Sequence, residues 1–141
     1  CWSPDGTIMY HTDTPSRRIY RYDFDTATGA ISNQSLLVCT EKGCFPDGAT
    51  VDADGYLWSA QWAASRGVRY SPEGAIDFVI SLPVSQPTCV AFGGPELNRL
   101  FITSAYQGLG AEDRSAQPEA GNLFIFETHI KGIADPLFQP G

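Results

Sequence analysis

The sequence predicts an all-β protein with the architecture of a β-propeller, and three observations support this prediction. Fourteen Gly and ten Pro residues divide the chain into short segments, which leaves little room for sustained helices. Most of these segments are rich in β-branched and aromatic residues, which favour strands. A turn signal also recurs, because Asp5-Gly6 near the start is repeated as Asp54-Gly55 in the middle of the chain.

The segments that we expect to form strands are each bounded by Gly, Pro, Asp or Asn. Asp-Gly dipeptides and other turns that contain Gly are typical hairpin connections, so consecutive strands are expected to pair in antiparallel fashion. The predicted strands are Ile8–Thr12, Arg18–Tyr22, Tyr56–Ser59, Val68–Tyr70, Ile76–Ile80, Leu100–Thr103 and Leu123–Phe126.

A looser internal match gives the repeat a third copy. Pro87–Phe92 resembles Pro46–Val51, and Leu100–Ile102 follows the former as Tyr56–Trp58 follows the latter. Four antiparallel strands repeated every 40–50 residues or so are typical of propeller blades. We therefore expect one propeller domain with three four-stranded blades, at about 1–42, 43–84 and 85–141. A β-sandwich also uses short strands, but it does not explain a repeated hairpin signal.

Three blades are too few to close a ring, since propellers typically have four to eight. An open ring would leave two exposed sheet edges, which favour aggregation. The chain begins with Cys1-Trp2-Ser3-Pro4 rather than with Met. We therefore expect a missing N-terminal half, or a second chain, to complete the ring.

Composition and charge exclude several classes of partner. Hydrophobic residues make up 43% of the chain and charged residues 18%, as in a globular protein. The net charge of −7 argues against nucleic acid and anionic membranes, which need a basic surface. No apolar stretch approaches the roughly 18 residues of a membrane span, and no leader sequence is visible. We expect a cytoplasmic protein that acts on a small molecule.

The four cysteines (Cys1, Cys39, Cys44 and Cys89) lack the spacing of a zinc site. We expect them to be reduced and to serve as small apolar residues in the interior. A bridge between Cys39 and Cys44 is the alternative in an oxidising compartment.

Asp47 is the candidate functional residue, although Pro-Asp-Gly is also an ordinary turn sequence, and Asp54 is its structural counterpart. In a propeller the start of the innermost strand and the end of the next strand share one face. Asp47 of Pro46-Asp47-Gly48 stands at such a start, whereas Asp54 lies in the hairpin on the opposite face. Further rim candidates on the face of Asp47 are Asp13, Gln61, Trp62, Thr88, Ser104 and Tyr106. The long connection from Ser104 to Gly121 is a candidate lid or wall.

Other chemistries lack their motifs. No Gly-x-Ser-x-Gly elbow is present, and Gly108-Leu109-Gly110 lacks the third glycine of a dinucleotide loop. His11 and His129 are the two histidines and lie far apart in sequence, so a His-rich metal site is not expected.

A collinear series of motifs resembles the C-terminal half of the gluconolactonase / regucalcin (senescence marker protein) / luciferin-regenerating-enzyme family, and its bacterial sugar-lactonase branch in particular. The series covers nearly the whole chain. Its members are Trp2–Gly6, Tyr10–Thr14, Phe45–Gly48, Val51–Trp58, Leu82–Val84, Gln86–Thr88, Phe92–Gly94, Thr103–Ala105 and Gln117–Gly121.

The resemblance implies a six-bladed propeller with one divalent metal in its channel, held by a Glu, an Asn and an Asp. The Asp corresponds to Asp47, which the resemblance makes a metal ligand. The Asn and the Glu would both lie upstream of Cys1. Ca, Zn, Mn, Mg and Fe all suit an oxygen-rich site.

The activity that the resemblance implies is hydrolysis of a sugar lactone, such as a glucono- or arabinono-lactone, to the aldonic acid. Asp47 would also be the catalytic residue that accepts a proton from the attacking water. Two alternatives are a non-catalytic calcium- or ligand-binding propeller like regucalcin, and a propeller that hydrolyses phosphoesters.

Overall fold

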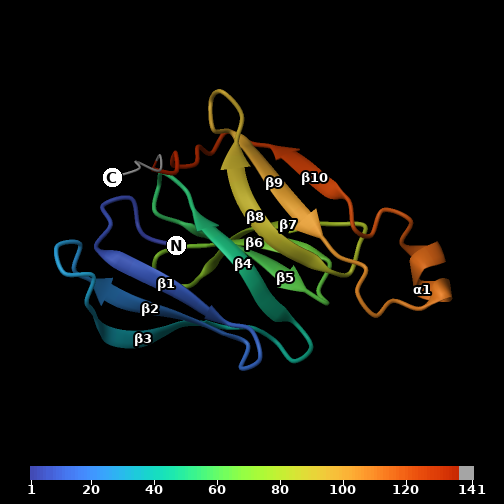
Figure 1. Ribbon diagram of the computed structural model, residues 1–141, viewed down its shortest axis with the longest axis horizontal. Coiled ribbons are helices and arrows are strands. Elements are labelled where there is room, and N and C mark those ends of the chain that lie inside the picture. Colours follow the sequence, from blue (N-terminus) through green and yellow to red (C-terminus); the bar gives the residue numbers. More distant parts are fainter. Residues whose placement is uncertain (137–141) are drawn as a thin grey trace, which may run out of the picture.

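The computed structural model describes residues 1–136, which form three antiparallel β-sheets and one short helix (Figure 1). The all-β prediction is confirmed. The first sheet has the order β1-β2-β3, the middle sheet β4-β5-β6-β7, and the last sheet β10-β9-β8. Their bounds are β1 (Ile8–Asp13), β2 (Arg18–Phe24), β3 (Ile31–Cys39), β4 (Phe45–Val51), β5 (Leu57–Trp62), β6 (Arg66–Tyr70), β7 (Ile76–Ser81), β8 (Pro87–Gly93), β9 (Arg99–Ser104) and β10 (Leu123–Glu127).

The first strands of the middle and last sheets, β4 and β8, lie side by side on the inner side, and β1 of the first sheet lies beside β4. In Figure 1, β1, β4 and β8 lie next to one another across the middle of the molecule, and β4 contacts both of its neighbours. The other strands follow outward in chain order within each sheet. Consecutive antiparallel sheets arranged in this way are neighbouring propeller blades. Each sheet lies within one of the ranges expected for a blade, although 137–141 lie outside the described residues.

Two hydrophobic cores lie between the sheets. One joins the first and middle sheets and includes Tyr10, Ile19 and Leu57, while the other joins the middle and last sheets and includes Trp58 and Leu100. Side chains alternate between the two faces of a strand. Successive residues of β5 therefore contribute to different cores, and the middle sheet is covered on both faces.

The middle sheet has the four predicted strands, and each outer sheet has three within residues 1–136. By the Asp-Gly repeat, β1–β3 correspond to β5–β7, so the equivalent of β4 would precede Ile8. Only an isolated bridge between Trp2 and Met9 stands there. After β10, hydrogen bonds from Thr128 to Asn98 and from Gly132 to Leu97 carry the chain toward the β8–β9 connection instead of into a further strand.

The predicted strands all appear, with extensions of one to three residues, except that β5 begins at Leu57 and leaves Tyr56 in the turn. The strand β3 was not predicted by itself, because its Ser-Asn-Gln-Ser run hides the apolar residues on either side. The four cysteines carry free thiols, and Cys44 is the buried one, whereas Cys39 and Cys89 are exposed. Within residues 1–136, no helix has the length and hydropathy of a membrane span.

Candidate functional site

Asp47 lies at the start of β4, at an irregularity in the pairing of that strand with β5. Pro46 pairs with Gln61 and Ala49 pairs with Ser59, so β4 accommodates one extra residue between these pairs. Such a β-bulge bends the strand and re-aims the side chain that it contains, and bulges are common beside active sites. The neighbouring strand β8 has a comparable irregularity at Thr88, between Pro87 and Cys89.

The carboxylate of Asp47 borders a small open cavity between β1 and β4. The cavity has a volume of about 280 Å³ and is lined by Cys1, Tyr10, His11, Thr12, Thr14, Asp47, Gly48 and Ala49. Sequence reasoning set His11 aside because it is remote from His129. The tertiary contact between β1 and β4 is what brings this exposed imidazole to the cavity of Asp47.

Partial burial raises the pKa of Asp47 above the ordinary value of an aspartate, and the backbone N–H of Gly48 offsets a part of this shift. Burial disfavours the charged form of a carboxyl group that has no cation beside it. Among residues 1–136, no side chain is recorded as a hydrogen-bond donor or salt-bridge partner of Asp47. A cation in the cavity would therefore gain a carboxylate ligand without first breaking a contact of this kind.

The donors present in the described residues fit one edge of a metal site. Asp47 offers a carboxylate, which suits a hard divalent cation. No group of three or more His, Cys, Asp or Glu residues that could hold a metal ion exists within residues 1–136. Of the described residues that line this cavity, Asp47 is the one that is acidic.

Among the other rim candidates, Asp13 and Thr88 make local contacts. Hydrogen bonds from Ser16 lower the pKa of Asp13 and identify it as a turn residue at the end of β1. The hydroxyl of Thr88 lies 2.7 Å from that of Thr103 on the neighbouring strand. Trp62 closes the end of β5 by an edge contact with Phe45, at 5.9 Å between ring centroids.

Gln61 was expected at the rim, but it is completely buried. Its side chain lies between the first and middle sheets and contacts Cys44, Arg66 and Tyr70. The position in the chain misled the prediction. Residues near the end of a central strand still alternate between the two neighbouring sheets, and neither direction is that of the channel.

Ser104 and Tyr106 belong to the long β9–β10 connection, which contains the helix α1 (Ala111–Ala116). Ser104 Oγ bonds to Asn122 and Gly121 and fixes the two ends of the connection together. Tyr106 is 52% exposed, and the guanidinium of Arg114 covers its ring at 4.6 Å. The connection also binds the segment before β8, because Gln117 Oε1 accepts from the backbone N–H of Ser85 at 2.6 Å. These contacts tie the connection to the last sheet, whereas α1 has no buried residue and lies at the edge of the molecule in Figure 1.

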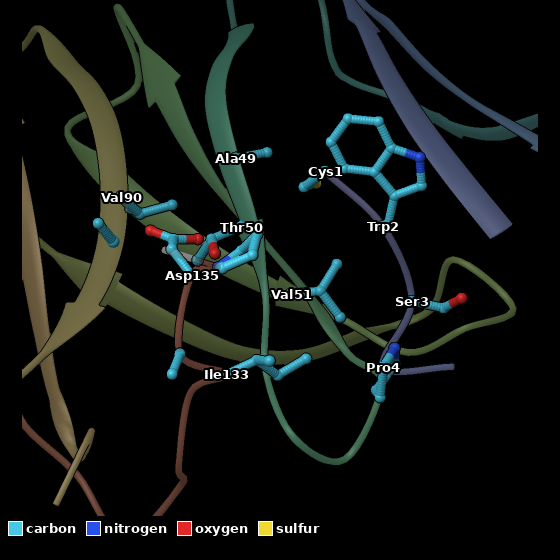
Figure 2. Close-up of a pocket in the computed structure, with 13 residues that line it drawn as sticks. Cys1, Trp2, Ser3, Pro4, Ala49, Thr50, Val51, Val90, Ile133 and Asp135 are labelled. Carbon is cyan, nitrogen blue, oxygen red and sulfur yellow. The ribbon is translucent and has the colours of Figure 1, made fainter. Parts of the chain in front are cut away.

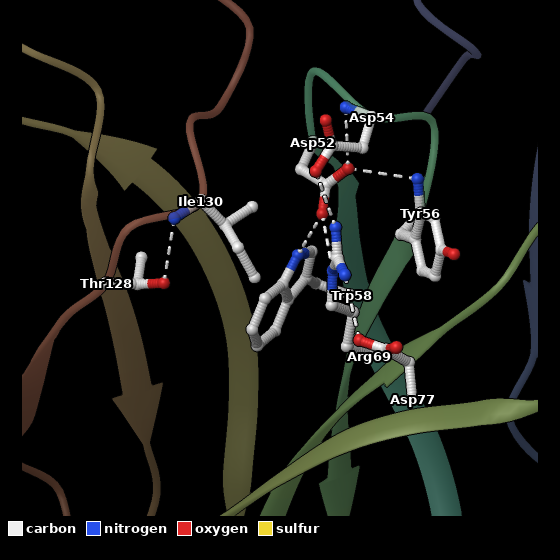
Figure 3. A network of polar contacts seen from close by, with 8 residues as sticks. All are labelled: Asp52, Asp54, Tyr56, Trp58, Arg69, Asp77, Thr128 and Ile130. Carbon is white, nitrogen blue, oxygen red and sulfur yellow. Dashed lines mark hydrogen bonds and ion pairs between the residues drawn. The ribbon is translucent and has the colours of Figure 1, made fainter.

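The opposite end of β4 carries a different kind of aspartate (Figure 3). Asp52 is completely buried, and its two oxygens accept from the backbone N–H groups of Asp54 and Tyr56 and from the side chains of Trp58 and Arg69, at 2.8–3.0 Å. Arg69 in turn binds Asp54 and Asp77. Asp54 is the turn residue that the sequence predicted, whereas the central place of Asp52 was not foreseen.

A larger cavity, of about 400 Å³, lies along the remainder of β4 (Figure 2). Its lining includes the N-terminal segment Cys1–Pro4, Thr50, Val90 and the segment 133–136. It is larger and has Asp135 in its lining, but it lacks Asp47 and the bulge of β4. The smaller cavity is therefore the better candidate site.

Comparisons with known proteins agree with this architecture. The family model described as SMP-30/Gluconolactonase/LRE-like region matches residues 1–106. A 6-deoxy-6-sulfogluconolactonase of Pseudomonas putida is 40% identical over 97% of this chain and 47% of its own length. An L-arabinolactonase of Azospirillum brasilense is 36% identical over 97% of this chain and 45% of its own length.

A solved structure shows the same fold. The calcium-binding protein regucalcin of Agrobacterium tumefaciens superposes with a TM-score of 0.93 and 34% identity, over 99% of this chain and 48% of that one. The chain spans about half the length of the curated relatives that it matches. On the extent of these matches, the chain belongs to the SMP-30/gluconolactonase/LRE-like family.

Proposed function

We propose that the intact protein hydrolyses a sugar lactone to the aldonic acid, with Asp47 as a ligand of a divalent cation and as the proton acceptor. The observation that carries this proposal is the state of Asp47. Asp47 is partly buried, stands in a bulge and lines a cavity. Relatives named as lactonases of sugar-derived substrates supply the substrate class.

The cation would be held by Asp47 together with ligands from outside this chain, since the described residues offer no complete set. When bound, a hard divalent cation polarises the lactone carbonyl and lowers the pKa of a coordinated water. Ca, Zn, Mn, Mg and Fe remain candidates for this ion.

The reaction needs one proton to be taken up and one to be delivered. As the water oxygen bonds to the carbonyl carbon, Asp47 accepts a proton from that water. The bond between the carbonyl carbon and the ring oxygen then breaks, and the ring oxygen receives a proton, so lactone plus water gives the hydroxy acid.

A second candidate is cation binding without catalysis. It is favoured by the likeness to regucalcin, whose structure is that of a calcium-binding protein. In this case Asp47 would be a ligand and no lactone would be consumed.

Replacement of Asp47 by Ala in the intact protein tests the proposal. We expect lactonase activity to fall by about 100- to 10,000-fold, the usual contribution of a general base, while thermal unfolding stays cooperative. Acid release from a panel of aldonolactones, with and without chelator, is the measurement. Near-normal turnover by Asp47→Ala would refute the assignment. Cation binding without acid release would favour the second candidate, and release from phosphoesters alone would favour a phosphoesterase.

A further inference from the structure

A buried polar cluster lies behind the start of β4, and we call Cys44, Gln61, Arg66 and Tyr70 the Gln61 cluster. Gln61 is at its centre. Its Oε1 accepts from Cys44 Sγ at 2.8 Å and from Arg66 Nε at 2.7 Å, and its Nε2 donates to the Tyr70 hydroxyl. Arg66 also pairs with Glu41 at 2.7 Å.

Every polar atom of the Gln61 side chain thus has a fixed partner. A buried amide is costly when its groups are left unpaired, so a fully satisfied network holds one arrangement of its members. Burial raises the pKa of the Cys44 thiol, which keeps it in the protonated form that donates to Gln61.

The cluster is connected to Asp47 through the turn that precedes β4. Cys44 lies three positions before Asp47 in the sequence. Its backbone N–H donates to the carbonyl of Glu41 at 3.0 Å, and its carbonyl accepts from Thr40 Oγ1 at 2.5 Å. The residue between the turn and the bulge, Pro46, pairs with Gln61 itself.

The bulge makes this support necessary. Asp47 and Gly48 stand where the ladder between β4 and β5 is interrupted, so regular strand pairing does not fix their backbone. The pairs Phe45–Trp62 and Pro46–Gln61 hold the chain directly before the bulge, and Cys44, bonded to Gln61, anchors the chain where these pairs begin. The pair Ala49–Ser59 holds the chain after the bulge.

We propose that the hydrogen bond from Cys44 Sγ to Gln61 Oε1 positions Asp47 for cation binding, because it anchors the residue through which the chain enters β4. This inference rests on the proposed role of Asp47 as a cation ligand. Gln61 and Cys44 are positioning residues in this proposal, because neither lines the cavity of Asp47. Partners that orient metal ligands typically change metal affinity by about 10- to 100-fold when removed.

The test compares two variants that each remove one partner of Gln61 in the intact protein. Cys44→Ala removes the partner that leads to Asp47, whereas Tyr70→Phe removes the partner on β6. The affinities for Ca²⁺ alone and for Zn²⁺ alone are measured by calorimetry. Thermal unfolding without cation reports stability separately. We expect Cys44→Ala to lower the affinity about tenfold or more, Cys44→Ser to restore it through its hydroxyl donor, and Tyr70→Phe to change it less than about twofold.

Asp47→Asn separates this inference from the proposed function. If Asp47→Asn leaves both affinities unchanged, the proposed role of Asp47 is wrong. Two other results would overturn the positioning role while Asp47→Asn abolishes cation binding. One is a normal cation affinity of Cys44→Ala, and the other is an equal loss of cation affinity in Cys44→Ala and Tyr70→Phe. Should Cys44→Ala fail to fold, Thr40→Val removes the hydroxyl that holds the Cys44 carbonyl, and its affinity must fall in the same way for the proposal to stand.

Discussion

The two ends of strand β4 each carry an aspartate in a different environment. At one end, Asp52 is buried and its oxygens accept four hydrogen bonds. At the other, Asp47 is partly buried in a bulge, and burial raises its pKa while the backbone N–H of Gly48 acts against this shift. A satisfied carboxylate holds the protein together, while a desolvated and unpaired one is available to a ligand. The comparison teaches that hydrogen-bond partners, more than burial, distinguish a structural aspartate from one that is available to a ligand.

The largest effect on stability is expected from Asp52→Ala in the intact protein. It leaves the buried guanidinium of Arg69 without its innermost partner, and breaking a buried pair in this way costs about 3–5 kcal/mol in the free energy of unfolding. Denaturant unfolding is the measurement. Asp77→Ala is the control, because the Asp77 side chain is 40% exposed and its loss should cost no more than about 1 kcal/mol. Loss of lactonase activity with unchanged unfolding would contradict the structural role of Asp52.

A smaller effect is expected from Gly48→Ala, beside Asp47. A methyl group at this position would lie 2.5 Å from Cys89 Sγ and 2.8 Å from Cys89 Cα, so β4 and β8 would have to separate. Overpacking of this kind costs about 1–3 kcal/mol, and it should also weaken cation binding because the bulge moves. Gly67→Ala in β6 is the matched control, since its methyl group would meet Ile102 at an ordinary 3.6 Å. Equal unfolding midpoints for the two variants would contradict this prediction, because they would show that β4 and β8 can separate at Gly48 without a loss of stability.

The smallest expected effect is on the pH dependence of protein stability, measured in the absence of added cation. The pKa of Asp47 is raised in the folded protein, so the folded state holds this proton more tightly than the unfolded state does. The contribution of protonated Asp47 to the free energy of unfolding is complete below the pKa of this group in the unfolded state, which is about 4. It is lost as the pH rises through the pKa of Asp47 in the folded state. Asp47→Asn should therefore raise the melting temperature slightly near pH 7, and the advantage should vanish below about pH 4. A lower melting temperature for Asp47→Asn at pH 7 would mean that the carboxylate is stabilised by a contact.

Particular residues show how far sequence reasoning reached at the two ends of β4. The repeated Asp-Gly signal predicted the hairpins, and with them the turn at Asp54, because hairpin chemistry is local. The importance of Asp52 was missed, since its main partner Arg69 lies 17 residues away on another strand. His11 was missed at the cavity of Asp47 for the same reason, as the contact between β1 and β4 is tertiary.

The sequence by itself determined the all-β class, the repeated hairpins and the candidacy of Asp47, because strand periodicity, turn residues and family motifs are written along the chain. Only the tertiary structure decided which side chains turn toward a neighbouring sheet and which toward a cavity. Gln61 shows the difference, since a polar residue near a strand end proved to be the centre of a buried cluster. The physical reason is that a sheet packed between two other sheets is buried on both faces. The environment of each side chain therefore depends on which neighbouring sheet packs against it.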